Sequence, residues 1–309
     1  ILVLRTEHEL NADIRKKVAH FCNVDEEAVI QSLDMPSIYE VPLSMQAQKL
    51  DAIILRKMNM PVGETPQLGP WRSFLDSTNK ATEIVHIALV GKYDLQDAYK
   101  SILESLAHAG TYNDYKVKTH FVNSEKLTRE NVAEQLKGMA GVVICPGFGQ
   151  RGTEGKIVAA EYTRTHDIPT FGICLGMQMM VIEFARNVLG YVDANSREMD
   201  EKTPHNVIDI MEEQKNITQM GGTMRLGAYE CDVREGSKTF EAYGQKQISE
   251  RHRHRYEFNN QYIKEYEKAG MQCVGTNPDS NLVEIVEIPA LKWYIGTQFH
   301  PEYSSTVLN

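Results

Sequence analysis

The stretch TFGICLGMQ, residues 170–178, predicts the fold class of this chain. An apolar run typical of a β-strand, residues 168–173, leads into Cys174, and a helical pattern, residues 177–187, leads out of it. The glycines two positions before and two positions after Cys174 allow the backbone to turn sharply between the strand and the helix. This is the pattern of an elbow that presents a nucleophile, with cysteine in place of serine. The N-terminus of the following helix favours the thiolate form.

A base for this thiol occurs near the other end of the chain, in GTQFHPE, residues 296–302. His300 can take the thiol proton, and Glu302 can orient the imidazole and stabilise its cation. The alternative interpretation is a buried structural cysteine and a core histidine, which is the commoner case for cysteines in general. The elbow glycines and the separate His-x-Glu pattern favour Cys174, His300 and Glu302 as a catalytic triad.

Strand and helix patterns alternate upstream of the elbow. The strand patterns cover residues 84–90, 117–122 and 141–145, and the helical patterns cover residues 95–109, 129–136 and 156–166, with Asp94 as a cap and Gly110 as a terminator of the first helix. This alternation predicts an α/β fold with a mostly parallel sheet flanked by helices. Residues 283–288 and 293–299 are expected to be paired strands that bring His300 to the site.

The chain is expected to divide into a short N-terminal part and one larger domain. Residues 1–60 have mixed α/β patterns, with extended pieces at residues 1–5, 28–30 and 37–41 and a helix over residues 13–22. The segment PVGETPQLGP, residues 61–70, indicates a linker, which we extend to residue 80. Residues 81–309 form the second domain. The first residues are strand-like and lack an initiator methionine, which suggests an excised fragment.

Composition excludes several classes of protein. A net charge of −9 over 309 residues argues against a nucleic-acid binder. No apolar run approaches the roughly 18 residues of a membrane-spanning helix. The five cysteines are scattered without a C-x-x-C pair, which suits a reducing compartment such as the cytoplasm.

The segment RHRHR, residues 251–255, alternates with a period of two, so on a strand its arginines would share one face and its histidines the other. The segment could be a solvated basic edge strand or could bind phosphate or nucleic acid. Zinc binding by His252 and His254 is disfavoured because no nearby acidic or cysteine ligand completes a set.

The segment CPGFGQRG, residues 145–152, follows a strand, where α/β sheets place their sites. Thioester formation passes through a tetrahedral oxyanion that backbone N–H groups must stabilise. Gly147 and Leu175 could supply two such N–H groups. A plain turn is the alternative interpretation of the glycines.

These motifs also carry a family resemblance. GICLGMQ with a distant QFHPE resembles the class I, or triad, glutamine amidotransferases. GKY at residues 91–93, DAYKS at residues 97–101, DANS at residues 193–196, MGGTMRLG at residues 220–227 and RHRHRYE at residues 251–257 are similar to the CTP synthases. The loop at residues 145–149 departs from the usual Pro-Gly-Gly-Phe-Gly of that family, because Cys145 and Pro146 replace its first two residues.

The resemblance implies hydrolysis of L-glutamine through a cysteinyl thioester on Cys174, in a ligase that aminates UTP to CTP. It assigns a glutamine-binding role to a set that includes Arg255 against the substrate carboxylate and Glu198 against the α-amino group. The full set is Gly147, Leu175, Gly176, Met177, Gln178, Glu198 and Arg255. It also implies that residues 219–227 form a loop that faces a partner or gates the site.

The resemblance identifies residues 1–60 as the end of an amidoligase domain whose remainder is missing. Lys17 matches a lysine that contacts the uridine nucleotide, and Met35 lies in a stretch that touches adenine. The complete enzyme is expected to use ATP and Mg²⁺, to respond to GTP as an activator, and to form a tetramer. The glutaminase half itself is expected to need no cofactor and no metal.

Two other functions are considered. One is a γ-glutamyl hydrolase or another amidotransferase on the same fold, which MGGTMRLG disfavours. The other is a catalytically idle regulatory or filament-forming module, which the intact Cys174, His300 and Glu302 disfavour.

Overall fold

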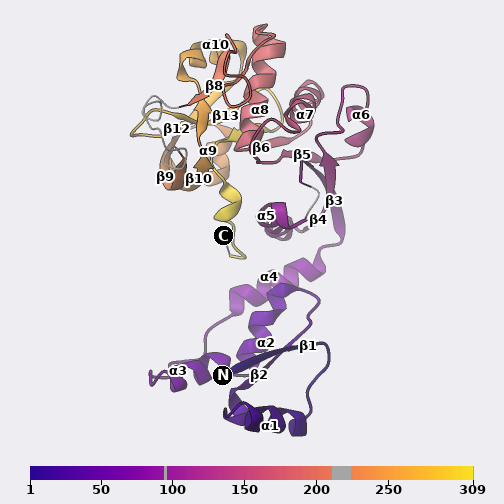
Figure 1. Ribbon diagram of the computed structural model, residues 1–309, viewed down its shortest axis with the longest axis vertical. Helices are drawn as coiled ribbons and strands as arrows, with labels where there is room; N and C mark the ends of the chain where they lie inside the picture. Colours follow the sequence, from indigo (N-terminus) through magenta and orange to yellow (C-terminus); the bar gives the residue numbers. More distant parts are fainter. Residues whose placement is uncertain (94–95, 211–223, 309) are drawn as a thin grey trace. The chain divides into compact units, whose positions relative to one another are not determined.

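The structure, a computed structural model, describes residues 1–93, 96–210 and 224–308 (Figure 1). The chain divides into two compact units, residues 1–81 and residues 82–307. In the part of the chain that the structure describes, no helix has the length and apolarity needed to cross a bilayer.

Unit 1 is built around two parallel strands, β1 (Leu2–Thr6) and β2 (Val29–Leu33), joined through α1 (Ala12–Phe21). The side chain of Asn11 caps α1 by accepting the N–H of Ile14. The remaining helices are α2 (Val41–Ala47), α3 (Leu50–Lys57) and α4 (Gly69–Lys80), with 3₁₀ turns at Glu26–Ala28 and Ile38–Glu40.

One expectation for unit 1 was wrong in detail. Residues 37–41 are not extended, because the Ser37 side chain accepts the N–H of Tyr39 and starts a 3₁₀ turn that leads into α2. Within the segment assigned to the linker, Gly69–Lys80 forms α4 with Pro70 in its first turn, where proline is compatible with a helix. Trp71 on α4 donates its indole N–H to the carbonyl oxygen of Tyr39 at 2.6 Å, which connects α4 to the rest of unit 1.

Unit 2 contains a nine-stranded sheet in the order β10-β9-β12-β13-β14-β6-β5-β3-β4. Its parallel strands are β3 (Glu83–Gly91), β4 (Tyr115–Asn123), β5 (Gly141–Ile144), β6 (Thr170–Ile173) and β14 (Tyr294–Thr297). Their order corresponds to the 2-1-3-4-5 arrangement of doubly wound flavodoxin-like sheets. The expectation of an α/β fold with a parallel sheet flanked by helices is confirmed for this core.

The rest of the sheet is antiparallel. It consists of β9 (Arg225–Val233), β10 (Gln247–His254), β12 (Gln272–Thr276) and β13 (Val283–Glu287). Strands β13 and β14 pair in antiparallel orientation because the connection between them is short, and parallel strands need a long crossover. A separate three-stranded sheet joins β7 (Asn195–Ser196), β8 (Asn206–Ile210) and β11 (Tyr256–Phe258).

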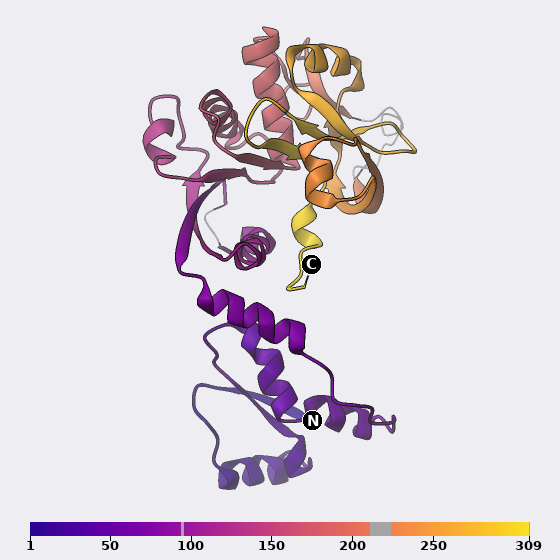
Figure 2. The same cartoon turned by 180° about the vertical axis from the view of Figure 1, so that it is seen from behind.

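Helices cover both faces of the parallel core. Figure 1 shows α7 (Thr153–Thr165) and α8 (Leu175–Phe184) on one face and α5 (Lys100–Tyr112) on the other, and the reverse view in Figure 2 agrees. Alternate residues of the central strands serve the two layers: Ile144 packs with α7 and α8, whereas Val143 packs with α5. The other helices are α6 (Val132–Gln135), α9 (Lys238–Tyr243) and α10 (Ile263–Ala269), and α8 continues as a π-helical turn, Ala185–Leu189.

Helix α5 does not end at Gly110 as expected, but continues to Tyr112. A Cβ at Gly110 would lie 2.9 Å from the carbonyl oxygen of Tyr115 on β4. Gly110 therefore permits close packing of α5 on β4 and does not terminate the helix. The expected cap, Asp94, lies outside the described residues.

The elbow glycines allow α8 to pack directly against the sheet. A Cβ on Gly176 would lie 2.0 Å from the carbonyl oxygen of Ile144 in β5. A Cβ on Gly172 would lie 2.9 Å from the backbone nitrogen of Met177 and 2.3 Å from the sulfur of Met180. Both positions require glycine because backbone atoms, which cannot rotate away, occupy the space.

We predict that Gly176→Ala lowers the free energy of unfolding by at least about 1–3 kcal/mol, the usual cost of overpacking, because α8 must move away from β5. Chemical denaturation measures the change. Gly63→Ala is the control, since nothing lies within 4 Å of the added methyl group. Equal stability of the two variants would contradict the packing described here.

Candidate active site

Cys174 occupies the turn between β6 and α8 in a conformation that is rare for a residue with a side chain. Its φ is 53° and its ψ is −108°. The N–H of Cys174 donates to the carbonyl oxygen of Thr297 at 2.7 Å, and its own carbonyl accepts the N–H of Gln178 at 3.1 Å. Such strain persists only where the surroundings hold the backbone, and it is common at functional sites. The side chain is 2% exposed.

His300 and Glu302 follow β14, the neighbour of β6. The Nδ1 atom of His300 lies 2.8 Å from Oε1 of Glu302. Burial by itself lowers the pKa of His300, but interactions with the neighbouring Cys174 and Glu302 raise it by more, to about 10. Glu302 therefore holds one side of the ring, and the raised pKa favours the imidazolium form of His300 near Cys174.

A pocket opens beside Cys174. Its lining includes five of the predicted glutamine-binding residues, namely Gly147, Leu175, Gln178, Glu198 and Arg255, together with Phe148, Met224, His254 and Tyr256. These residues come from the loop after β5, from α8, from the segment after β7 and from the end of β10. The sequence resemblance pointed to the first five, and the fold brings them together around one thiol.

The other two predicted binding residues do not line this pocket. Gly176 lies against Ile144, and Met177 is fully buried in the core below the elbow, next to Gly296. They support the turn from beneath.

Two pocket side chains are fixed by bonds to the backbone. Glu198 accepts the N–H of Gly149 at 2.8 Å. It thus holds residues 145–152, called the glycine loop below, against the segment after β7. Gln178 donates to the carbonyl oxygen of Tyr256 at 2.9 Å and so connects α8 to β11.

Buried lysines, which sequence analysis missed, support the glycine loop. The Nζ atom of Lys156 is buried and donates to the carbonyl oxygens of Cys145 at 2.6 Å and Pro146 at 3.4 Å. Burial lowers the pKa of Lys156 to about 8. Lys92 donates to the carbonyl oxygen of Phe148. A signal for Lys156 was present, because it shares a helix face with Ala159, Ala160 and Thr163.

Cys145 is a second cysteine close to the site, but its environment is different. It is fully buried, and burial raises the pKa of its thiol to about 12. A thiol with this pKa is a poor nucleophile near neutral pH. Cys174 is thus the better nucleophile candidate of the two.

Residues 251–254 lie on β10, at an edge of the sheet, and their alternation is clear: the histidines are buried and Arg251 and Arg253 are exposed. The expectation that all three arginines share one face was incomplete, because β10 ends at His254 and Arg255 turns into the pocket lining. Within the described residues, no group of three His, Cys, Asp or Glu side chains could hold a metal ion.

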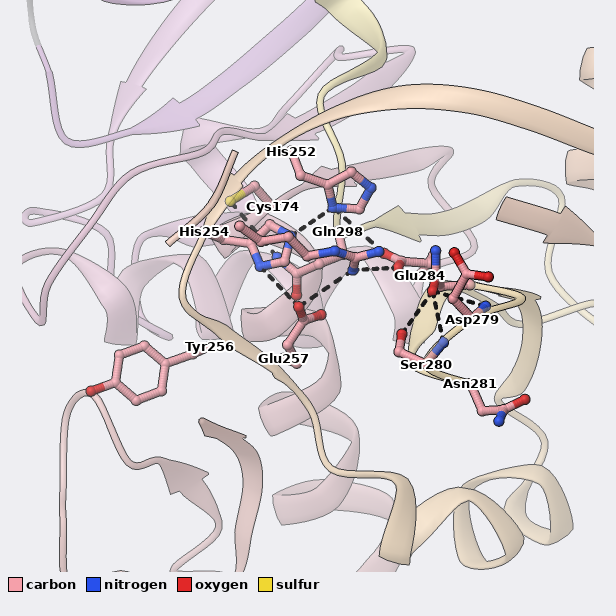
Figure 3. A network of polar contacts seen from close by, with 12 residues as sticks. Cys174, His252, His254, Tyr256, Glu257, Asp279, Ser280, Asn281, Glu284 and Gln298 are labelled. Atoms are coloured by element: carbon pink, nitrogen blue, oxygen red, sulfur yellow. Dashed lines mark hydrogen bonds and ion pairs between the residues drawn. The ribbon is translucent and has the colours of Figure 1, made fainter. Parts of the chain in front are cut away.

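A buried ionic cluster lies next to these histidines (Figure 3). Arg225 contacts Glu284 at 2.5 Å and Glu257 at 3.4 Å. Burial raises the pKa of Glu284 to about 7, and burial together with the neighbouring carboxylate of Glu284 raises the pKa of Glu257 well above its usual range. Burial and Arg225 lower the pKa of His252 to about 3, so that ring is neutral.

The predicted nucleotide-binding residues lie in unit 1, where Lys17 is exposed on α1 and Met35 is half-buried after β2. Residues 220–223 of the MGGTMRLG segment lie outside the described residues. Of the remainder, Met224 lines the pocket and Arg225 begins β9.

Comparisons with known proteins agree with this geometry. The profile of the family described as glutamine amidotransferase class-I matches residues 94–309, and that described as CTP synthase N-terminus matches residues 1–60. The glutaminase domain of the Trypanosoma brucei CTP synthase, solved with bound acivicin, superposes with a TM-score of 0.69 at 39% identity, covering 72% of this chain and 88% of that one.

Full-length relatives agree as well. CTP synthases of Bacteroides thetaiotaomicron and Porphyromonas gingivalis are 75% and 60% identical over all of this chain. The chain spans 58% of the length of each. It therefore belongs to the class I glutamine amidotransferase family and, within it, to the CTP synthases.

Proposed function

We propose that unit 2 hydrolyses L-glutamine to glutamate and ammonia, with Cys174 as nucleophile, His300 as acid and base, and Glu302 as the partner of His300. The observation that carries this proposal is the strained, buried Cys174 beside the His300–Glu302 pair in a pocket that also holds Glu198 and Arg255.

In the first half of the reaction, the thiolate of Cys174 attacks the side-chain amide carbon of glutamine. The oxyanion that forms accepts hydrogen bonds from the N–H groups of Gly147 and Leu175, which both line the pocket. The His300 imidazolium gives its proton to the departing nitrogen, the C–N bond breaks, and ammonia leaves a γ-glutamyl thioester on Cys174.

In the second half, neutral His300 takes a proton from water, which attacks the thioester. The C–S bond breaks, and glutamate and the thiolate are regenerated with the proton on His300. Glu302 holds the ring through Nδ1 in both halves and stabilises its cation. Arg255 binds the substrate α-carboxylate and Glu198 binds the α-amino group, because their charges are complementary to those of an amino acid.

In the complete enzyme, a ligase, the ammonia would aminate UTP that ATP and Mg²⁺ activate, and GTP would act as an activator. Residues 1–60 would be the end of that amidoligase domain, with Lys17 and Met35 at its nucleotide site, and residues 81–309 would be the glutaminase domain. Of these two residues, Lys17 lies on α1 and Met35 follows β2. We further propose a cytoplasmic tetramer, and the five free cysteines support a reducing location.

The proposal is tested with the glutamine analogue 6-diazo-5-oxo-L-norleucine, which carries an electrophile at the position of the amide. We expect one adduct per chain, mapped by peptide mass spectrometry to Cys174. Cys174→Ala should abolish both labelling and glutamine hydrolysis, because the covalent step is lost. Cys22→Ala, at an exposed cysteine, is the control and should behave as the parent chain. An adduct on another cysteine, or hydrolysis by Cys174→Ala at the parent rate, would refute the assignment and favour the idle module.

We predict that His300→Ala reduces kcat far more than Glu302→Gln does. Loss of His300 removes the proton carrier, an effect of about 10²–10⁴ in rate, whereas a glutamine at position 302 can still hold the ring without balancing its charge. Steady-state ammonia release at saturating glutamine measures both variants. Equal losses would show that charge stabilisation by Glu302 matters as much as proton transfer.

We predict that Lys156→Met lowers kcat by about tenfold, because the loop that carries the Gly147 N–H loses both of its hydrogen bonds to Nζ. The expected loss is smaller than the roughly 10²–10³ that removal of one oxyanion donor costs, because the donor itself remains. Folding should be retained, since methionine has a similar volume and no charge to desolvate. Thermal denaturation checks this. Lys137→Met, at an exposed lysine, is the control. An unchanged kcat in folded Lys156→Met would mean that the loop is held without Nζ.

A further inference from the structure

Strand register places the side chain of Gln298 beside the thiol. In the parallel pair of β6 and β14, Ile173 is opposite Thr297, so the next residues along the two chains, Cys174 and Gln298, also lie side by side. The backbone N–H of Gln298 donates to the carbonyl oxygen of Glu284 at 2.8 Å, which ties the segment to β13 on its other side. The Gln298 side chain is fully buried, and Figure 3 shows it between Cys174 and the ionic cluster.

A chain of three hydrogen bonds determines which way the Gln298 amide faces. It begins at the carbonyl oxygen of Tyr256, which can only accept, so the Gln178 side chain must present its Nε2 there, at 2.9 Å. The same Nε2 lies 3.2 Å from Oε1 of Gln298. With its oxygen turned to Gln178, the Gln298 amide presents Nε2 to the Sγ of Cys174, at 3.8 Å.

We propose that Gln298 is a further catalytic residue, a fixed N–H donor that stabilises the thiolate of Cys174. The inference rests on the proposed function, because it assigns Gln298 to the same nucleophile. A neutral amide can donate to the sulfur but cannot take its proton. The proton must therefore go to His300, and Gln298 compensates the sulfur for the water that burial removes.

Other groups also act on the sulfur, and they differ from Gln298 in kind. Around the two side chains lie His300, Glu302 and Tyr303 after β14, Lys156 on α7, His254 on β10 and Glu284 on β13. The charged groups among them act on the sulfur through their electrostatic potential or exchange protons with it. Gln298 has no charge, so its contribution persists wherever the thiolate exists.

The test compares Gln298→Met, which keeps the approximate volume and removes the donor, with the parent chain. The rate at which iodoacetamide alkylates Cys174 is followed by peptide mass spectrometry from pH 5 to pH 9. We expect the variant to react about tenfold more slowly at neutral pH, equivalent to about 1.4 kcal/mol, and its pH profile to move upward by about one unit. Gln247→Met, at an exposed glutamine bonded to Asp232, is the control and should leave the profile unchanged.

If Gln298→Met does not fold, Gln178→Met supplies the second test. It removes the N–H that orients Gln298 while Gln298 itself remains, so a smaller upward movement of the same profile is expected. If folded Gln298→Met has the alkylation rate and pH profile of the parent chain, the proposal is overturned. If only Gln178→Met folds, the same result in that variant overturns it.

Alkylation requires no glutamine, so a failure of the donor role can be distinguished from a failure of the proposed function. If the parent chain fails to hydrolyse glutamine while the profile of Gln298→Met moves upward, the proposed function is refuted and the donor role stands. If hydrolysis occurs and the profile does not move, only the donor role is refuted.

Discussion

The close approach of α8 to the parallel sheet is the constraint on which the site depends. Gly172 and Gly176 let the backbone of α8 come within contact distance of β5, and only this approach allows the chain to reverse within one residue after β6. Cys174 is the residue at this reversal. Its backbone has a positive φ, and its N–H donates to the carbonyl oxygen of Thr297. Any larger side chain at either glycine would move the helix and with it the nucleophile, the Leu175 N–H and the Gln178 amide.

Buried charges around this elbow are compensated in different ways. Lys156 donates to backbone carbonyl oxygens, Arg225 contacts two glutamates, and His300 contacts Glu302. Because burial disfavours the charged form of each group, these side chains stay charged only where close polar partners compensate for the lost water. The interior beside the pocket is therefore polar, which suits a reaction in which charge develops on oxygen and nitrogen.

Sequence patterns predicted the elements that lie deep in the sheet more accurately than those at its margins. The strands β3, β5 and β6 are continuous apolar segments and the helix α7 has a helical pattern, and tertiary packing agrees with these local preferences. Gly110 was expected to end a helix, but it allows α5 to pack closely against β4. This contact forms only after the chain has turned back on itself, so the local pattern could not show it. The alternation of residues 251–255 could not show that Arg255 leaves the strand, because the end of β10 depends on its pairing with β9.

The sequence by itself determined the nucleophile elbow, the His-x-Glu pattern, the α/β class and the family resemblance, because each of these is written in short segments with local physical requirements. Only the tertiary structure decided which polar groups meet. Gln298 and Cys174 come from segments far apart in the chain, and Lys156 reaches back to the glycine loop from the helix that follows it. Their contacts follow from strand order and register, which the packing of the whole sheet selects and no local pattern encodes.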